Sequence, residues 1–403
     1  MLARPALVFS SALLLAACGT GDSPGLPVVV TDSAGVKIIE NPAPTELGPW
    51  TRTVGATLLR HAPGADAPEP PLYRISGARR LSDGRLAVSD QGAKGVRLYS
   101  AQGVWERTMG AEGQGPGEFQ NPVLLGLVGE DSLVVGDVDN RRITILHPDV
   151  GLVRTAAIPD AAGGYPIPQG LLDDGSVLVG GGFFFSSGQG RQMQSGVSRG
   201  PTTFAALFPD GALRAALGEF PGIEMYWEVS ASGLRGRLIP FGKIPVAAAG
   251  ASRIYLGTSD RYEILAFDQE GALREIIRSR YQPPAVSAED LRHYRDERLE
   301  DADDAEERRQ IEDDLNQTPP AERWPAYQSF LVDGAGRLWV GAYRGPGDDD
   351  PVYAVFAADG RMLGTVAFPP RFRPFDIGDD YVLGSRFDEL DQETLEMVAL
   401  QGG

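Results

Sequence analysis

The chain has 403 residues, of which 42% are apolar, and its 37 basic and 55 acidic residues give a net charge of −18. A surface this acidic repels phosphate backbones and anionic lipid faces, which argues against a nucleic-acid partner. The single cysteine excludes a disulfide framework and a thiolate-rich metal site. With 51 glycines and 31 prolines, the composition indicates a turn-rich, all-β globular body.

Residues 1–17 are predicted to be a signal peptide. An apolar run from Ala6 to Ala17 follows a basic start and is too short to span a bilayer as a helix. Leu15-Ala16-Ala17-Cys18 resembles the bacterial lipobox, which implies cleavage before Cys18 and acylation of that cysteine. Residues 18–27 would then form a lipidated tether. Gly19, rather than an aspartate, follows the cysteine, and in this the sequence resembles lipoproteins that are sorted to an outer membrane. The alternative is an ordinary signal peptide with a chance cysteine.

One strand pattern recurs six times and always has apolar residues at its third and fifth positions. The copies are Gly84–Asp90, Asp131–Asp137, Gly175–Gly181, Ser252–Thr258, Gly336–Ala342 and Asp379–Ser385. A two-residue period is typical of β-strands, and Asp-Gly turns precede several copies. Five copies continue into a hairpin of two further strands, whereas the sixth has only one more strand, Leu395–Leu400.

The N-terminal segment Val28–Glu40 has a strand, turn, strand form that could supply the missing strand of the sixth unit. An N-terminal strand in the last sheet would close a ring and remove two exposed sheet edges. We therefore predict an all-β fold for residues 28–403, a six-bladed β-propeller closed by an N-terminal strand, with one helical insertion. A β-sandwich with unrelated hairpins is the alternative.

Two motifs in the second unit carry a family resemblance. Gly113–Pro122 and Asp137–Ile143 resemble an NHL repeat, which has a glycine-rich turn, Phe-x-x-Pro, and a strand ending in Asp before an Asn-x-Arg-Ile turn. Val30–Pro42 resembles the opening of bacterial secreted six-bladed propellers of the NHL and TolB-like superfamily. The resemblance implies a secreted propeller and covers residues 80–160 at the level of motifs.

Two long insertions interrupt the repeats. Residues 288–316 are predicted to be helical, with Ser287 as the N-cap, and hold 13 acidic and 5 basic residues. This insertion could act as a docking arm or a lid, or it could be a solvated helical hairpin that decorates a blade. The second insertion, Gly180–Pro201, surrounds three phenylalanines at 183–185 and either folds over the channel mouth or is buried between blades.

No catalytic grouping of side chains can be read from the sequence. The three histidines fall in unrelated contexts, so we expect no zinc site and no catalytic residue; they are His61, His147 and His293. Calcium stays open as a cofactor because oxygen ligands cluster at 137–140 and at 348–350, although Asp and Asn are also the usual residues of turns. Propeller lactonases of the gluconolactonase type use such ligands, but their motif cannot be matched here residue by residue.

Propellers usually bind ligands in the central depression formed by loops that lead into the innermost strands. The candidates at these loops are Tyr73, Arg74, Tyr226, Trp227, Tyr343, Arg344 and Arg386. Arg344 and Arg386 both follow the repeated strand, and if they converge they favour a carboxylate or phosphate ligand. Each could instead pack against its own blade or pair with a surplus carboxylate.

These features predict a monomeric, lipid-anchored protein of the cell envelope, on the periplasmic or surface face of an outer membrane. Its expected partners are the membrane, through the anchor at Cys18, and an envelope protein or a small anionic ligand. The first functional hypothesis is a non-enzymatic ligand-binding or protein-binding scaffold. The second is a calcium-dependent hydrolase or lactonase.

Overall fold

A computed structural model describes residues 28–63, 69–159, 166–180, 194–230, 233–300, 302–388 and 392–402. The predicted signal peptide, Cys18, the tether and the phenylalanines at 183–185 lie outside these ranges. The described helices are α1 (Pro44–Leu47), α2 (Ala288–Glu300) and α3 (Ala305–Gln317), and none of them has the length and apolarity needed to cross a membrane.

Strands dominate the described residues and form six sheets, which we call blades 1 to 6. Blade 1 holds β4 (Ile75–Arg80), β5 (Leu86–Asp90), β6 (Gly95–Tyr99) and β7 (Trp105–Met109). Blade 2 holds β8 (Pro122–Val128), β9 (Ser132–Asp137), β10 (Arg142–His147) and β11 (Gly151–Ala157). Blade 3 holds β12 (Ile167–Leu171), β13 (Val177–Gly180), β14 (Gly196–Leu207), β15 (Leu213–Ser230) and β16 (Gly233–Leu238).

Two of the remaining three blades, blades 4 and 6, include strands from the N-terminal region. Blade 4 holds β17 (Val246–Gly250), β18 (Arg253–Gly257), β19 (Glu263–Asp268) and β20 (Leu273–Ser279), extended by β2 (Val36–Asn41) and β1 (Val29–Ser33). Blade 5 holds β21 (Ser329–Val332), β22 (Leu338–Gly341), β23 (Val352–Phe356) and β24 (Met362–Ala367). Blade 6 holds β25 (Phe372–Ile377), β26 (Tyr381–Phe387), β27 (Glu393–Gln401) and β3 (Thr53–His61).

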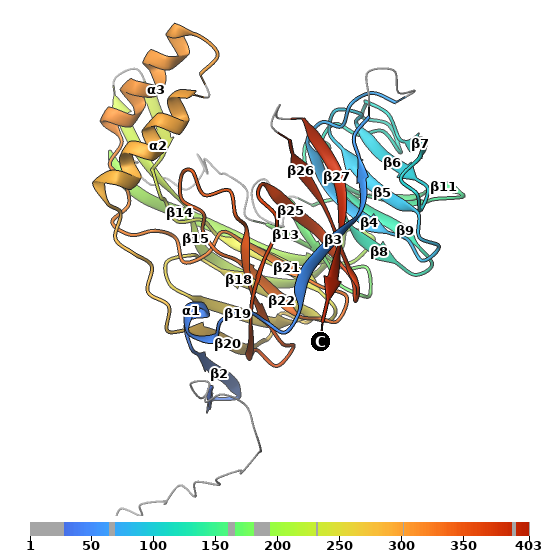
Figure 1. Ribbon diagram of the computed structural model, residues 1–403, viewed down its shortest axis with the longest axis horizontal. Helices are drawn as coiled ribbons and strands as arrows, with labels where there is room; N and C mark the ends of the chain where they lie inside the picture. Colours follow the sequence, from blue (N-terminus) through green and yellow to red (C-terminus); the bar gives the residue numbers. More distant parts are fainter. Residues whose placement is uncertain are drawn as a thin grey trace, which may run out of the picture.

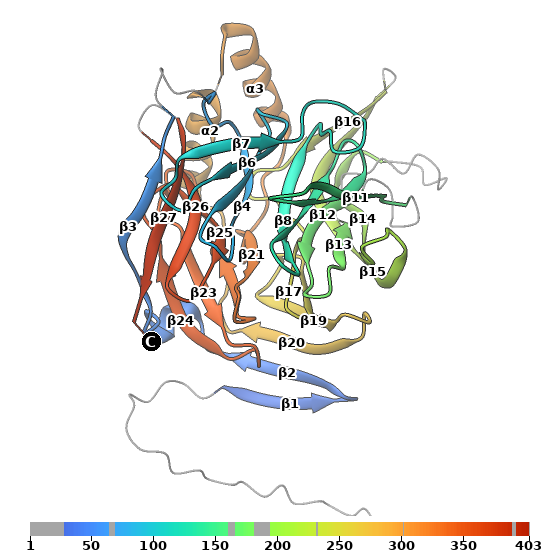
Figure 2. The ribbon, with the colours of Figure 1, turned by 90° about the vertical axis from the view of Figure 1, so that its right-hand side faces the viewer.

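The blades follow one another around a central axis. Innermost strands of successive blades contact each other from β4 through β8, β12 and β17 to β21, and β25 contacts β4. In Figure 2, blade 6 (red) and blade 3 (green) lie on opposite sides of the molecule, with blade 4 (yellow) below them. This arrangement is a β-propeller, and the predicted fold class is confirmed.

The repeated sequence pattern is the second strand of every blade: β5, β9, β13, β18, β22 and β26. All five residues of β5 are buried, because neighbouring blades cover both faces of the sheet. A tight turn precedes β5, and Gly84 has φ +90° there, in the left-handed region that favours glycine. The apolar positions that revealed the repeat are therefore the packing surfaces between blades.

Ring closure uses a different segment from the one predicted. β3 (Thr53–His61) pairs antiparallel with β27 and completes blade 6, so an N-terminal strand does close the propeller. The predicted segment, Val28–Glu40, instead forms the β1–β2 hairpin, in which β2 pairs in parallel with β20 of blade 4 (Figure 2). The prediction was wrong because β3 is largely exposed and lacks a clear apolar alternation, whereas Val28–Glu40 shows one.

The β2 strand is fixed to the propeller by one apolar and one polar side chain. Ile39 is 1% exposed and belongs to the core between blades 4 and 5. Asn41 donates from Nδ2 to the Gly360 carbonyl at 3.0 Å and accepts from the Met362 amide at 2.8 Å. Because both contacts are with residues of blade 5, β2 joins two blades as well as extending one.

A buried cluster of charges connects the closing strand to blade 1. Arg97 lies 2.6 Å from the Asp90 carboxylate and 3.4 Å from that of Glu69, and the Arg97 and Asp90 side chains are 1% and 0% exposed. Glu69 also accepts from the Tyr99 hydroxyl at 3.0 Å and lies 2.8 Å from Nε2 of His61, at the end of β3. Such a pairing compensates charges that are costly to bury alone.

The helical insertion forms a hairpin of α2 and α3 that projects at the end of the molecule opposite β1 and β2 (Figures 1 and 2). The predicted cap is confirmed, because the Ser287 hydroxyl accepts from the Asp290 amide at 3.1 Å. The hairpin contacts the outer part of blade 3 through Arg237, whose Nε lies 2.9 Å from the Asp314 carboxylate of α3. It is therefore packed against a neighbouring blade, as well as forming a connection between blades 4 and 5.

Candidate functional site

A cleft of about 730 Å³ lies between α2 and the loops of blades 5 and 6. One wall is the α2 face that carries His293, Asp296, Glu297 and Glu300, and the others are the loop from Tyr343 to Pro351 and the start of β25. The spacing of the four α2 residues places them on one side of a helix. Cavities of this size hold small-molecule ligands in many proteins.

A second cavity of about 560 Å³ lies beside the cleft, at the propeller axis. This channel cavity is lined by the innermost strands β4, β8, β12, β21 and β25. Five residues line both spaces, and they are Gln328, Tyr343, Arg344, Tyr353 and Arg373. The two cavities therefore adjoin each other at this shared wall, which we call the channel mouth.

Three arginines line the channel cavity: Arg79, Arg344 and Arg373. Arg79 donates to the carbonyls of Ala78, Phe375 and Leu125 at 2.6 to 2.7 Å, so backbone dipoles hold its guanidinium in place. The described residues provide no ion-pair partner for any of the three, and the described lining of this cavity contains no carboxylate. The charged side chains that line the channel cavity are therefore all positive, in a strongly negative protein.

Arg344 and Arg373 differ in how they are held. The Arg344 side chain is half-buried, and its Nε is buried without a hydrogen-bond partner among the described residues. Arg373 is exposed, and its guanidinium lies 5.0 Å from the centre of the Phe375 ring, at cation–π distance. Both guanidinium groups keep donors available for an anion at the shared wall.

Tyrosine hydroxyls complete this wall as uncharged groups. Burial raises the pKa of Tyr343 to about 12, with the charge of Glu297 adding to the effect. Burial also raises the pKa of Tyr353, which Arg344 and Arg373 partly oppose. At neutral pH both hydroxyls are therefore hydrogen-bond donors and do not repel an anion.

An aromatic cluster sets the position of α2 beside the channel mouth. Phe241 stacks on Trp324 with ring centres 5.5 Å apart and also contacts Tyr294 of α2 and Tyr343 of the shared wall, at 5.7 and 6.1 Å. Trp324 donates from Nε1 to the Asp290 carboxylate at 3.2 Å. The acidic face of α2 is thus held next to the arginines by contacts on its apolar side.

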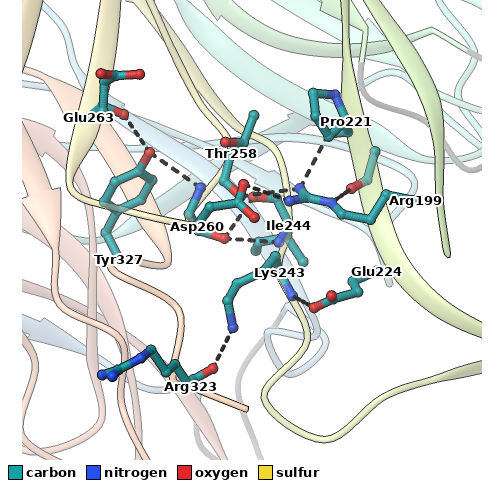
Figure 3. A network of polar contacts seen from close by, with 12 residues as sticks. Arg199, Pro221, Glu224, Lys243, Ile244, Thr258, Asp260, Glu263, Arg323 and Tyr327 are labelled. Carbon is teal, nitrogen blue, oxygen red and sulfur yellow. Dashed lines mark hydrogen bonds and ion pairs between the residues drawn. The ribbon is translucent and has the colours of Figure 1, made fainter. Parts of the chain in front are cut away.

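A network of polar contacts joins blades 3, 4 and 5 (Figure 3). Arg199 of β14 lies 2.6 Å from the Asp260 carboxylate and donates to the Thr258 carbonyl at 3.1 Å. Tyr327, which precedes β21, donates to the Glu263 carbonyl at 2.8 Å. The segment that leads to Gln328 of the shared wall is therefore fixed to blade 4.

Lys243 is the buried cation of this network (Figure 3). Its Nζ donates to the carbonyls of Phe241 and Arg323, and its backbone amide donates to the Glu224 carboxylate at 3.0 Å. Burial lowers the pKa of this lysine. The ammonium group thus joins the segment before β17 to the segment after α3. Because these segments carry Phe241 and Trp324, this link supports the aromatic cluster.

The predicted site residues are dispersed, and only two reach the cavities. Tyr343 and Arg344 line the shared wall, whereas Tyr73 and Arg74 are exposed and stack on each other at 5.3 Å. Tyr226 and Trp227 lie in β15, towards the outer part of blade 3. Arg386 lines a neighbouring cavity and lies 3.8 Å from the Glu396 carboxylate of its own blade, so the structure does not bring it into either cavity with Arg344.

The sequence prediction missed Arg79, Arg373 and the acidic face of α2. The two arginines belong to innermost strands, which the repeated pattern does not mark. The α2 face had a readable signal, since positions 293, 296, 297 and 300 follow helical spacing. What could not be read was that this face lies beside the channel mouth.

Neither the described turn at 137–140 nor the channel cavity has a donor set that fits calcium. Both Asp137 oxygens are used by Gln120, Asn121 and Asn140, as in a structural turn. Calcium needs six to eight oxygen ligands, usually with several carboxylates, and the channel cavity presents arginines instead. Within the described ranges, no group of three or more His, Cys, Asp or Glu side chains is placed to hold a metal.

Solved structures resemble this chain at low identity. A protein from Bacteroides fragilis NCTC 9343 named as exported has a TM-score of 0.48 and 10% identity, over 91% of this chain and 99% of that one. An inactive variant of virginiamycin B lyase from Staphylococcus aureus scores 0.41 with 12% identity, over 84% and 87%. A gluconolactonase from Xanthomonas campestris scores 0.40 with 14% identity, over 88% and 98%. No family model and no curated protein matches the chain.

Proposed function

We propose that this protein is a lipid-anchored β-propeller of the cell envelope that binds a small anionic ligand at its channel mouth and does not convert it. The observation that carries the proposal is the pair of arginines Arg344 and Arg373, which line the shared wall without an ion-pair partner among the described residues. Guanidinium groups bind carboxylates and phosphates through directed, charge-assisted hydrogen bonds. Nothing in the channel cavity favours the calcium-dependent hydrolase.

Calorimetric titration of the full-length mature protein in detergent tests the ligand class. Citrate and inorganic phosphate are the probes, and at least one should bind, with an affinity that falls as salt is added. Arg344→Gln should weaken binding about tenfold, because it removes a charged donor. Arg74→Gln is the control, since Arg74 is exposed and lies outside both cavities. Equal binding by wild type and Arg344→Gln, or no binding at all, would show the proposal to be wrong.

The membrane anchor is proposed to be Cys18, with the protein a monomer on the periplasmic or surface face of the outer membrane. The support is the lipobox-like sequence Leu15-Ala16-Ala17-Cys18 and the short tether that follows it. Cys18→Ser should release the protein from the membrane fraction or leave an unprocessed precursor. Acyl labelling that persists in this variant would contradict the anchor.

A further inference from the structure

The cleft wall opposite the arginines carries the other sign of charge. Asp296, Glu297 and Glu300 are exposed on α2 and line the cleft, and the described residues supply no ion-pair partner for them. They therefore have not been neutralised by the arginines across the cleft. Two sets of opposite charges face one concave space without meeting each other.

The charges are divided unequally between the two cavities. The three carboxylates line only the cleft, as do Asp348, Asp349 and Arg371, whereas Arg344 and Arg373 line both the cleft and the channel cavity. Carboxylates thus outnumber arginines around the cleft, and the described lining of the channel cavity holds arginines without a carboxylate. The carboxylates of α2 and the two arginines line the same cleft of about 730 Å³.

We infer that the ligand is a zwitterion of the amino-acid or short-peptide class, an inference that rests on the proposed anion-binding function. Its carboxylate would contact Arg344 and Arg373, and its ammonium group would remain in the cleft beside Asp296, Glu297 and Glu300. Tyr353 and Phe372 also line the cleft. The cleft volume of about 730 Å³ accommodates a molecule of a few residues.

Three forms of the tripeptide Ala-Tyr-Ala test this inference by calorimetric titration of the full-length mature protein: free ends, N-acetylated and C-amidated. The free form should bind most tightly. C-amidation should weaken binding about tenfold, because the guanidinium groups lose a charged acceptor. N-acetylation should weaken it roughly threefold, because exposed carboxylates attract an ammonium group more weakly.

Variants then assign the ammonium contact. Glu297→Gln should lower the affinity for the free peptide and leave that for the N-acetylated form unchanged. Glu289→Gln is the matched control, because Glu289 is an exposed carboxylate in the first turn of the same helix and does not line the cleft.

The outcomes separate this inference from the proposed function. Equal affinities for the free and N-acetylated peptides would overturn the zwitterion and leave anion binding standing, as would binding of citrate or phosphate with no binding of any peptide. Equal affinities for the free and C-amidated peptides would overturn the role of the arginines and with it both proposals. If Glu289→Gln weakens binding as much as Glu297→Gln does, the ammonium contact at Glu297 is overturned, because the overall negative charge of α2 would then account for the effect.

Discussion

Removing the Asp90 carboxylate should destabilise the propeller more than removing any exposed one. Asp90 lies 2.6 Å from Arg97 in a site where both side chains are almost fully buried, and its other oxygen accepts from the Gly92 and Ala93 amides at 2.7 and 3.0 Å. Breaking a buried ion pair by removing one partner costs about 3–5 kcal/mol. We expect Asp90→Ala to lower the free energy of unfolding by about 3 kcal/mol, the lower end of this range, because Glu69 and the carbonyls of Pro70 and Pro71 still contact Arg97.

Urea unfolding followed by circular dichroism measures this loss. The control is Asp149→Ala, because Asp149 is an exposed carboxylate 3.0 Å from Arg85 and should contribute no more than about 1 kcal/mol. Adding Arg97→Met to Asp90→Ala removes both charges and should recover part of the stability. If Asp90→Ala and Asp149→Ala lower the free energy of unfolding equally, the argument from buried charge is refuted.

Three further predictions follow from the fold. Deleting residues 28–33, the exposed β1, should leave the thermal midpoint unchanged, whereas deleting residues 53–61 should abolish the cooperative transition, because it opens blade 6. Burial raises the pKa of Glu393 in the folded protein. The protonated side chain therefore stabilises the fold at a pH below the usual pKa of glutamate, and this contribution is lost as the pH rises through the raised pKa. Glu393→Gln should remove this part of the difference between the free energies of unfolding that urea gives at pH 4 and at pH 7. Replacing residues 288–316 with a short Gly/Ser linker should keep the strand signal in circular dichroism. Tryptophan fluorescence should shift to the red, because Trp324 is no longer covered by α2. Loss of cooperative unfolding would contradict the view that the helical hairpin lies outside the blades.

The sequence predicted what repeats and missed what occurs once. The second strand of every blade was found because burial on both faces imposes the same apolar pattern six times, as in Leu86 and Val88. The closing strand β3 was missed because none of its residues is fully buried, so burial imposes no clear apolar pattern on it. In the site, Arg344 was found because it follows a repeated strand. That Arg344 and Arg373 line the same cavities depends on how blades 5 and 6 are arranged, which no local sequence pattern encodes.

The β1–β2 hairpin also determines how the protein responds to a pull on the chain before Val28. Force applied there acts first on β1, whose five residues are all exposed and whose pairing partner is β2 alone. The next resistance is the pairing of β2 with β20 and the buried side chain of Ile39. Asn41 follows, and its hydrogen bonds with Gly360 and Met362 clamp the chain to blade 5 before the path reaches β3. Under tension β1 should therefore peel away first and absorb extension, while the strand that closes the ring carries no load until β2 and the Asn41 clamp fail.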